Sequence, residues 1–345
     1  MMIRLARQAA MAAIEATSLR LLLAIQPAGA APVPDDAGLD SLSGAYLAAR
    51  NADVEKDYVN AAAYYQLALK ADPDNVYFLE RALVLTAATG DVEQAIGFAR
   101  QLKAQADNSH PARLVLAVAA IRNKNYAEAL GLLSASTAGE KVGAVADLTS
   151  ALIVAWARSG QGEIDKSVSE LGKLKGESWY NAYKLLHAGY IETASGRVQD
   201  AVKAFADARD LDPNAVRVAE AYARALALAG RPQEAIGVLQ DFLVRFPDNP
   251  LANAALDDIR AGRNRADWVA TPAEGVAEAL AGIGTAVGQQ GGIEVALFYL
   301  RLSLYLEPHT AGGLAGYSLG NLLDASEQGA NVPATRRPAT ESSDL

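Results

Sequence analysis

The chain has 345 residues, of which 51% are hydrophobic and 6% aromatic, and its formal net charge is −9. It contains no cysteine, which excludes disulfide bonds, thiolate metal sites and a cysteine nucleophile. A composition rich in alanine and leucine favours packed helices over a β-sandwich, and the negative charge argues against nucleic acid as a partner.

The N-terminal 30 residues have the pattern of a secretory signal. Arg4, Arg7 and Arg20 accompany an apolar run at 21–25, and small residues at 28–30 follow. We therefore predict a signal peptide at 1–30, a linker at 31–41, and a periplasmic or secreted protein. The alternative is an attached amphipathic helix on a cytoplasmic protein. Because no other segment has about 18 uninterrupted apolar residues, no membrane span is predicted.

A repeated frame of small and large residues then begins. It is anchored on a small residue, followed in most frames by a large one four positions later and by a small one seven positions later. Successive anchors are separated by 34, 34, 38, 34, 34 and 61 residues, and they are Ala61, Ala95, Ala129, Ser167, Ala201, Ala235 and Ala296. A recurring period of this kind indicates a repeat architecture.

Each frame predicts two helices joined by a short turn. Apolar residues recur three or four positions apart, as in 198–211, which places them on one helical stripe. A break lies five residues before each anchor, usually at a glycine that can adopt the left-handed conformation: Gly90, Gly162, Gly196, Gly230 and Gly291, with Lys56 and Lys124 in the other two frames. Prolines at 73, 213, 247 and 308 stop four of the second helices.

Small residues twelve positions before the anchors predict close packing of the two helices in a hairpin. Gly189, for example, would face Phe205, the large residue four positions after Ala201. One hairpin cannot bury both of its apolar faces, so stacking of successive hairpins is expected.

Three segments depart from the repeat. Residues 250–262 predict an extra helix, and the loop that follows to 272 carries Trp268, which we expect to cover that helix or, alternatively, to contact a partner. Residues 312–325 predict one unpaired C-terminal helix. The polar, proline-containing segment 326–345 predicts a disordered tail.

The period, the order of small and large residues and the closing proline resemble the tetratricopeptide repeat, with the units around Ala201 and Ala235 as the closest matches. The resemblance covers residues 42–325. It implies an all-α fold, an α-solenoid of about seven tetratricopeptide-like hairpins with the extra helix and the unpaired C-terminal helix. The units around Ala129 and Ser167 lack the closing proline and are expected to pack irregularly.

The resemblance also implies a concave groove, lined by the first helix of each hairpin, that receives a partner helix or an extended peptide. The implied groove residues are Tyr46, Arg50, Tyr77, Glu80, Trp156, Tyr183, Tyr190, Arg217, Glu220 and Arg224. They lack the Lys–Asn pair with which related clamps hold a terminal carboxylate, so an amphipathic helix or apolar peptide is the expected ligand. Alternatively, Trp156, Tyr183 and Tyr190 pack between neighbouring hairpins.

No pattern of catalytic residues is present. The three histidines, His110, His187 and His309, have no metal-ligand spacing and are assigned bridging or capping roles. We therefore predict no enzyme activity, no cofactor and no metal. The predicted function is a protein–protein interaction scaffold in a cell-envelope complex, the partner being another protein or peptide. The alternatives are the recognition portion of a larger enzyme or secretion machine, and a cytoplasmic assembly chaperone.

Overall fold

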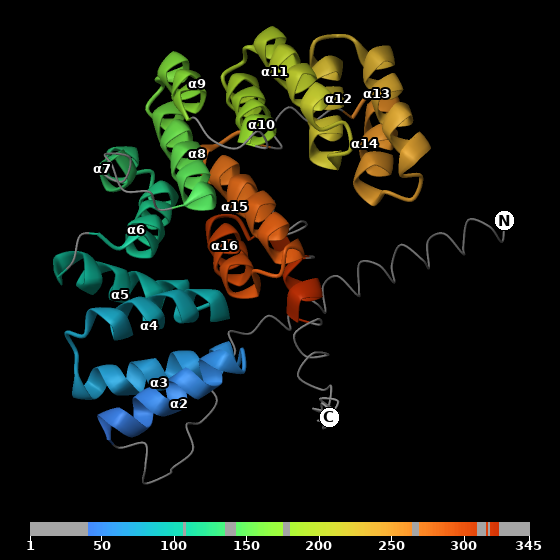
Figure 1. Cartoon of the computed structure of the whole chain (residues 1–345). Helices are drawn as coiled ribbons and strands as arrows, with labels where there is room; N and C mark the ends of the chain where they lie inside the picture. Colours follow the sequence, from blue (N-terminus) through green and yellow to red (C-terminus); the bar gives the residue numbers. More distant parts are fainter. Residues whose placement is uncertain are drawn as a thin grey trace, which may run out of the picture. The chain divides into compact units, whose positions relative to one another are not determined.

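The computed structural model describes residues 41–105, 108–134, 143–174, 180–263, 269–308, 315–316 and 318–323. All regular secondary structure within these ranges is α-helical (Figure 1). The chain divides into two compact units, residues 1–112 and 113–345. The predicted signal peptide, the predicted tail and Trp268 lie outside the described residues.

Unit 1 contains two stacked helical hairpins. The first pairs α2 (Leu42–Val54) with α3 (Tyr58–Ala71), and the second pairs α4 (Val76–Thr89) with α5 (Val92–Gln105). Helix α3 packs on α4, which joins the two layers. Asn75 begins α4 as its N-cap, because its side chain accepts the Phe78 N–H.

Unit 2 continues with hairpins and an extra helix. The helices are α6 (His110–Arg122, which begins at the boundary), α7 (Tyr126–Ser134), α8 (Ala144–Gly160), α9 (Ile164–Lys173), α10 (Tyr180–Ala194), α11 (Val198–Leu211), α12 (Val216–Leu228), α13 (Pro232–Arg245), α14 (Pro250–Arg260), α15 (Pro272–Gln289) and α16 (Ile293–Leu306). Helix α14, the predicted extra helix, packs on α12 and α13. The predicted fold class is confirmed.

The repeat frame describes the interior of both units. All seven anchor residues are completely buried, including Ser167, whose hydroxyl donates to the carbonyl of Ala155 at 2.6 Å. The predicted breaks also hold: the five glycines have φ between +77° and +114°, and Lys56 and Lys124 share this left-handed backbone with φ of 61° and 58°. The turn geometry therefore belongs to the repeat and not to glycine alone.

The frames around Ala129 and Ser167, two of the three that lack a closing proline, have the shortest second helices. Helix α7 has nine residues and α9 has ten, whereas the other second helices have fourteen. Of the predicted C-terminal helix, residues 318–323 are helical and Leu319 is buried, while Leu314 and Tyr317 lie outside the described residues.

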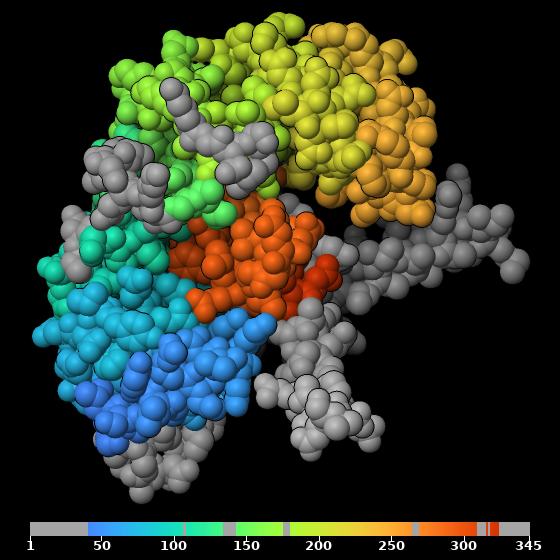
Figure 2. Space-filling view, viewed as in Figure 1, coloured from blue at the N-terminus to red at the C-terminus, as the bar shows by residue number. Residues whose placement is uncertain are grey.

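Hairpin α15–α16 is not added to the end of the stack. In a continuous solenoid it would follow α14, but α15 packs against α8 and α10, and the hydroxyl of Thr149 in α8 donates to that of Tyr299 in α16 at 3.3 Å. The guanidinium of Arg122 in α6 also lies 4.0 Å from the ring centre of Tyr305 in α16. Figures 1 and 2 show this hairpin, in orange, beside the green helix α8.

The predicted close packing of the two helices is visible at Gly189 in α10. A Cβ atom at this position would lie 2.4 Å from the Phe205 ring of α11, and both residues are buried. Gly237 in α13 has the opposite environment, since nothing lies within 4 Å of its Cβ position.

We expect Gly189→Ala to lower the free energy of unfolding by about 1–3 kcal/mol, because Phe205 must move to accept the methyl group. The matched variant Gly237→Ala should raise it by about 0.5–1 kcal/mol, because alanine favours a helix more than glycine does. Chemical denaturation followed by circular dichroism measures both. Equal effects of the two variants would contradict this account of the repeat.

Candidate protein-binding site

The first helices α8, α10 and α12 form the inner face of unit 2, and they carry six of the predicted groove residues. Helix α15 of the same chain lies on this face. It contacts α8 and α10 directly and is joined to α12 by an ion pair. The groove that the sequence predicts for a partner is therefore occupied by a helix of the chain itself.

Trp156 on α8 meets α15 at a glycine. A Cβ atom at Gly275 would fall 2.0 Å from the indole ring, so a larger residue cannot occupy that position with the ring in place. The indole N–H donates to Nδ1 of His187 on α10 at 3.1 Å. Trp156 is completely buried, so its ring is sandwiched between the neighbouring hairpin and α15.

Tyr183 and Tyr190 lie on α10 but have different environments. The hydroxyl of Tyr183 donates to the carbonyl of Gly282 in α15 at 3.3 Å, and burial raises its pKa to about 12. Tyr190 is buried, and its ring makes edge contacts with His187 and Phe205 at centre distances of 5.7 and 5.4 Å. Tyr183 therefore faces α15, whereas Tyr190 packs within the stack.

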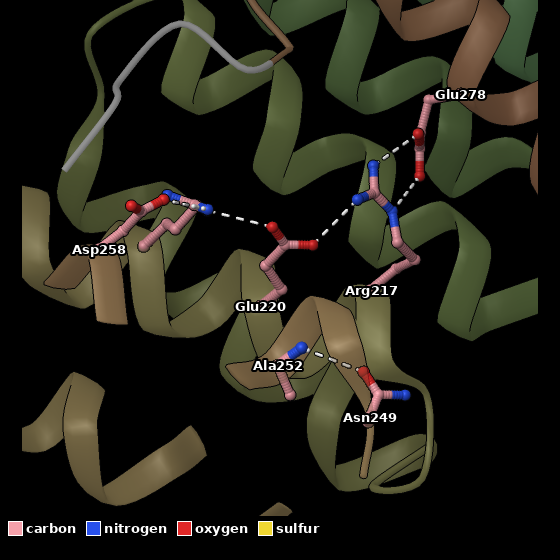
Figure 3. Close-up of polar contacts among 7 residues, drawn as sticks. Arg217, Glu220, Asn249, Ala252, Asp258 and Glu278 are labelled. Carbon is pink, nitrogen blue, oxygen red and sulfur yellow. Dashed lines mark hydrogen bonds and ion pairs between the residues drawn. The ribbon is translucent and has the colours of Figure 1, made fainter. Parts of the chain in front are cut away.

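Arg217 on α12 holds α15 through two parallel hydrogen bonds. Its Nε and Nη2 atoms donate to the two carboxylate oxygens of Glu278, each at 2.6 Å. Figure 3 shows Arg217 between Glu278 and Glu220, which accepts from Nη1 at 2.9 Å. The side chain of Glu278 is only 8% exposed, so this bidentate pair holds its charge largely away from water.

The charges continue along α12 toward α14. Glu220 also accepts from Nε of Arg224 at 3.2 Å, and Nη2 of Arg224 lies 3.4 Å from an oxygen of Asp258 in α14. Acidic and basic groups alternate along this chain of contacts. Because each carboxylate has an arginine beside it, Glu220 and Arg224 stay buried at 6% and 8% exposure.

A cavity of about 380 Å³ remains beside the second half of α15. It is lined by residues of α10, of the start of α12 and of α15, among them Tyr183, His187, Arg217, Gly282, Ala286 and Gln289. Helix α15 therefore fills the end of the groove at Trp156 but leaves space at the other end.

Comparison with known families decides the identity of the repeat. Residues 188–250, which contain α11, α12 and α13, match the family model described as tetratricopeptide repeat. The segment 188–250 is therefore made of tetratricopeptide repeats. No curated protein matches its sequence.

Solved structures of tetratricopeptide repeat proteins are similar to this chain at low identity. "YrrB: a TPR protein with an unusual peptide-binding site" is 14% identical, with a TM-score of 0.41, and the match covers 57% of this chain and all of that one. A tetratricopeptide repeat protein from Parabacteroides merdae ATCC 43184 is 14% identical, with a TM-score of 0.36 and coverage of 83% and 98%. A thermophilic tetratricopeptide repeat protein of Thermus thermophilus is 16% identical, with a TM-score of 0.29 and coverage of 64% and 100%.

The remaining predicted groove residues lie in unit 1. The rings of Tyr46, Tyr77 and Phe78 contact one another, and Nη1 of Arg50 donates to the hydroxyl of Tyr77 at 3.2 Å. Tyr77 is 43% exposed and Arg50 is exposed, while Glu80 is half-buried. Unit 1 thus presents an aromatic and cationic surface of its own to solvent.

Sequence reasoning missed the residues of α15 that meet the inner face. The repeat frame assigns Gly275, Glu278 and Gly282 only to a first helix, yet they follow one another at intervals of three and four. An acidic residue on the otherwise apolar stretch 275–283 was the available signal. Among the described residues, no group of three or more histidines and carboxylates could hold a metal ion, and no helix is long and apolar enough to cross a membrane.

We expect Arg217→Ala to lower the free energy of unfolding by about 3 kcal/mol, because it leaves the buried carboxylate of Glu278 without its bidentate partner. Replacing both residues, as Arg217→Met with Glu278→Leu, should recover most of the loss. Lys203→Ala, which removes an exposed ion pair with Asp207, is the control and should change little. Additive losses in the double variant would show that the pair is not coupled.

We expect acid to destabilise the fold through His187. Burial lowers the pKa of His187 to about 4, and its Nδ1 must stay unprotonated to accept from Trp156. The unfolded chain, with a histidine pKa of about 6.5, therefore binds more protons between pH 6.5 and 4, and stability falls as the pH falls through this range.

The loss should approach about 1.4 kcal/mol for each pH unit. His187→Asn, which offers an amide oxygen to Trp156 but has no titration in this range, is the matched control. Denaturation curves at pH 7, 6 and 5 for both proteins measure the difference. Parallel pH dependence of the two would contradict the assignment.

Proposed function

We propose that this protein is a protein–protein interaction scaffold whose inner face binds a helix or an extended peptide of a partner protein. The observation that supports the proposal is that α15 lies against the predicted groove residues of unit 2. Three predicted groove residues, Trp156, Tyr183 and Arg217, contact a helix there. A surface that already accommodates a helix through aromatic and charged anchors has the chemistry needed to bind one from another protein.

The surface of unit 1 supports the same function. Tyr77 and Arg50 are accessible to solvent and offer a ring face, a hydroxyl and a guanidinium side by side. Tyrosine gives a large contact area at a low cost in conformational entropy, and arginine adds directional hydrogen bonds, so both residue types are enriched where proteins bind one another.

The cell-envelope setting is part of the proposal and rests on the sequence of residues 1–30. Their basic start, apolar run and small residues at 28–30 are typical of an exported protein. An acidic scaffold without cysteine is compatible with the periplasm, where it needs no disulfide to fold.

Site-specific photocrosslinking in the native cell tests both parts. A benzophenone amino acid at Tyr77 should capture a partner of unit 1, and one at Tyr183 a partner of the inner face of unit 2. At Val244, which is 83% exposed on a second helix, it should capture none. Mass spectrometry then identifies the partner and the first residue of the mature chain, with Ala31 expected. Capture at Val244 alone would exclude the inner face, and a chain that still begins at residue 1 would exclude export.

A further inference from the structure

The contacts of α15 define a pattern that the inner face recognises. Gly275 meets the ring of Trp156, Glu278 meets the guanidinium of Arg217, and Gly282 meets the hydroxyl of Tyr183. These positions are i, i+3 and i+7 of one helix, so they share one stripe. Trp156, Arg217 and Tyr183 come from three different hairpins, so one helix contacts three layers of the stack.

Each position has a physical requirement. At the first, a Cβ atom would overlap the indole of Trp156, so only a residue without a side chain fits. The second requires a carboxylate, because Arg217 offers two parallel N–H groups in a largely buried place. At the third, a Cβ atom would lie 3.3 Å from the Tyr183 ring, which favours a small residue.

Hairpin α15–α16 is covalently tethered to the groove that it occupies. Residues 261–271 connect α14 to α15, so the hairpin is always near the groove and competes with any free ligand at a high effective concentration. A partner helix can therefore bind only to the fraction of molecules in which α15 is displaced, and its apparent affinity falls in proportion.

The cavity beside α15 indicates that the groove is larger than its internal occupant requires. This pocket of about 380 Å³ next to Ala286 and Gln289 is partly open to solvent, and α15 does not fill it. A helix with a larger apolar residue at the position of Ala286 would fill this space. The groove thus matches a helix that shares the stripe of α15 but has a bulkier second half.

We propose that the groove of α8, α10 and α12 recognises a partner helix with a glycine, a carboxylate and a small residue at i, i+3 and i+7, and that α15 is the internal copy of this helix, which the partner displaces. This inference rests on the proposed scaffold function. The tether favours the chain's own groove over that of a second copy, so the occupant that replaces α15 belongs to another protein.

The test uses the full chain as host and a fluorescently labelled synthetic hairpin of residues 271–307 as probe. Gly275→Leu in the host forces α15 away from Trp156, and Gly237→Leu is the matched control at a helical glycine with open space. Fluorescence anisotropy should show that the Gly275→Leu host binds the probe at least about tenfold more tightly than the wild-type and control hosts.

Changes in the probe test the recognised pattern. A probe with Gly275→Leu or Glu278→Ala should lose at least about tenfold in affinity, whereas Ala286→Leu should gain about fivefold by filling the cavity. Equal binding of the Gly275→Leu probe and the native probe would overturn the proposal. So would a wild-type chain that forms dimers by exchanging hairpins, as seen by light scattering.

Two further measurements apply if Gly275→Leu does not fold. Glu278→Arg in the host opposes Arg217 with a like charge and should also open the groove to the probe. In the wild-type chain, amide hydrogens of α15 and α16 should exchange at least about tenfold faster than those of α8 and α10. Equal protection of all four helices would overturn the proposal.

The outcomes separate this inference from the scaffold function. Suppose that a folded Gly275→Leu host fails to bind the probe but Tyr77 and Tyr183 give partner crosslinks. This result would contradict the displacement of α15 and support the scaffold function. Probe binding without any partner crosslink would support the groove specificity and contradict the scaffold function.

Discussion

The structure depends on the fact that a two-helix hairpin has more apolar surface than it can bury by itself. Within each hairpin a small residue lets the helices approach, as at Gly189 beside Phe205, and a completely buried anchor marks the seam. The remaining apolar faces need neighbouring hairpins, so the layers of each unit form together. The same requirement explains the left-handed turns at Lys56 and Lys124: the register of the two helices fixes the turn, and lysine adopts a backbone that glycine would adopt more easily.

Hairpin α15–α16 meets this requirement in a different way from the other hairpins. It buries its apolar surface against the inner face and not against the last layer, and α14 covers α12 and α13 instead. Two kinds of contact fix its place: the steric fit of Gly275 to Trp156, and the bidentate pair of Glu278 with Arg217. The first contact depends on complementary shape, and the second depends on complementary charge in a largely buried environment. Together they select one orientation of α15 along the groove.

The predicted groove residues fall into two groups that the sequence alone could not separate. Trp156, Tyr183 and Arg217 contact α15, whereas Tyr190, Glu220 and Arg224 are buried in contacts among the hairpins and with α14. Tyr190 packs between hairpins, as one interpretation of the aromatic residues expected, whereas Tyr183 and Trp156 contact α15 of the same chain. The difference arises because residues one turn apart on a helix face different neighbours once those neighbours are in place.

The sequence by itself determined the hairpins, their turns, their buried anchors and the extra helix at 250–260, because each depends on contacts within a few tens of residues. Periodicity and small–large pairing carry that local information directly. Only the tertiary structure decided where the last hairpin lies and which side chains it covers. Glu278 meets Arg217 across 61 residues and Thr149 meets Tyr299 across 150, and no period in the sequence records such distant contacts. Their formation depends on the assembled shape and charge of the inner face.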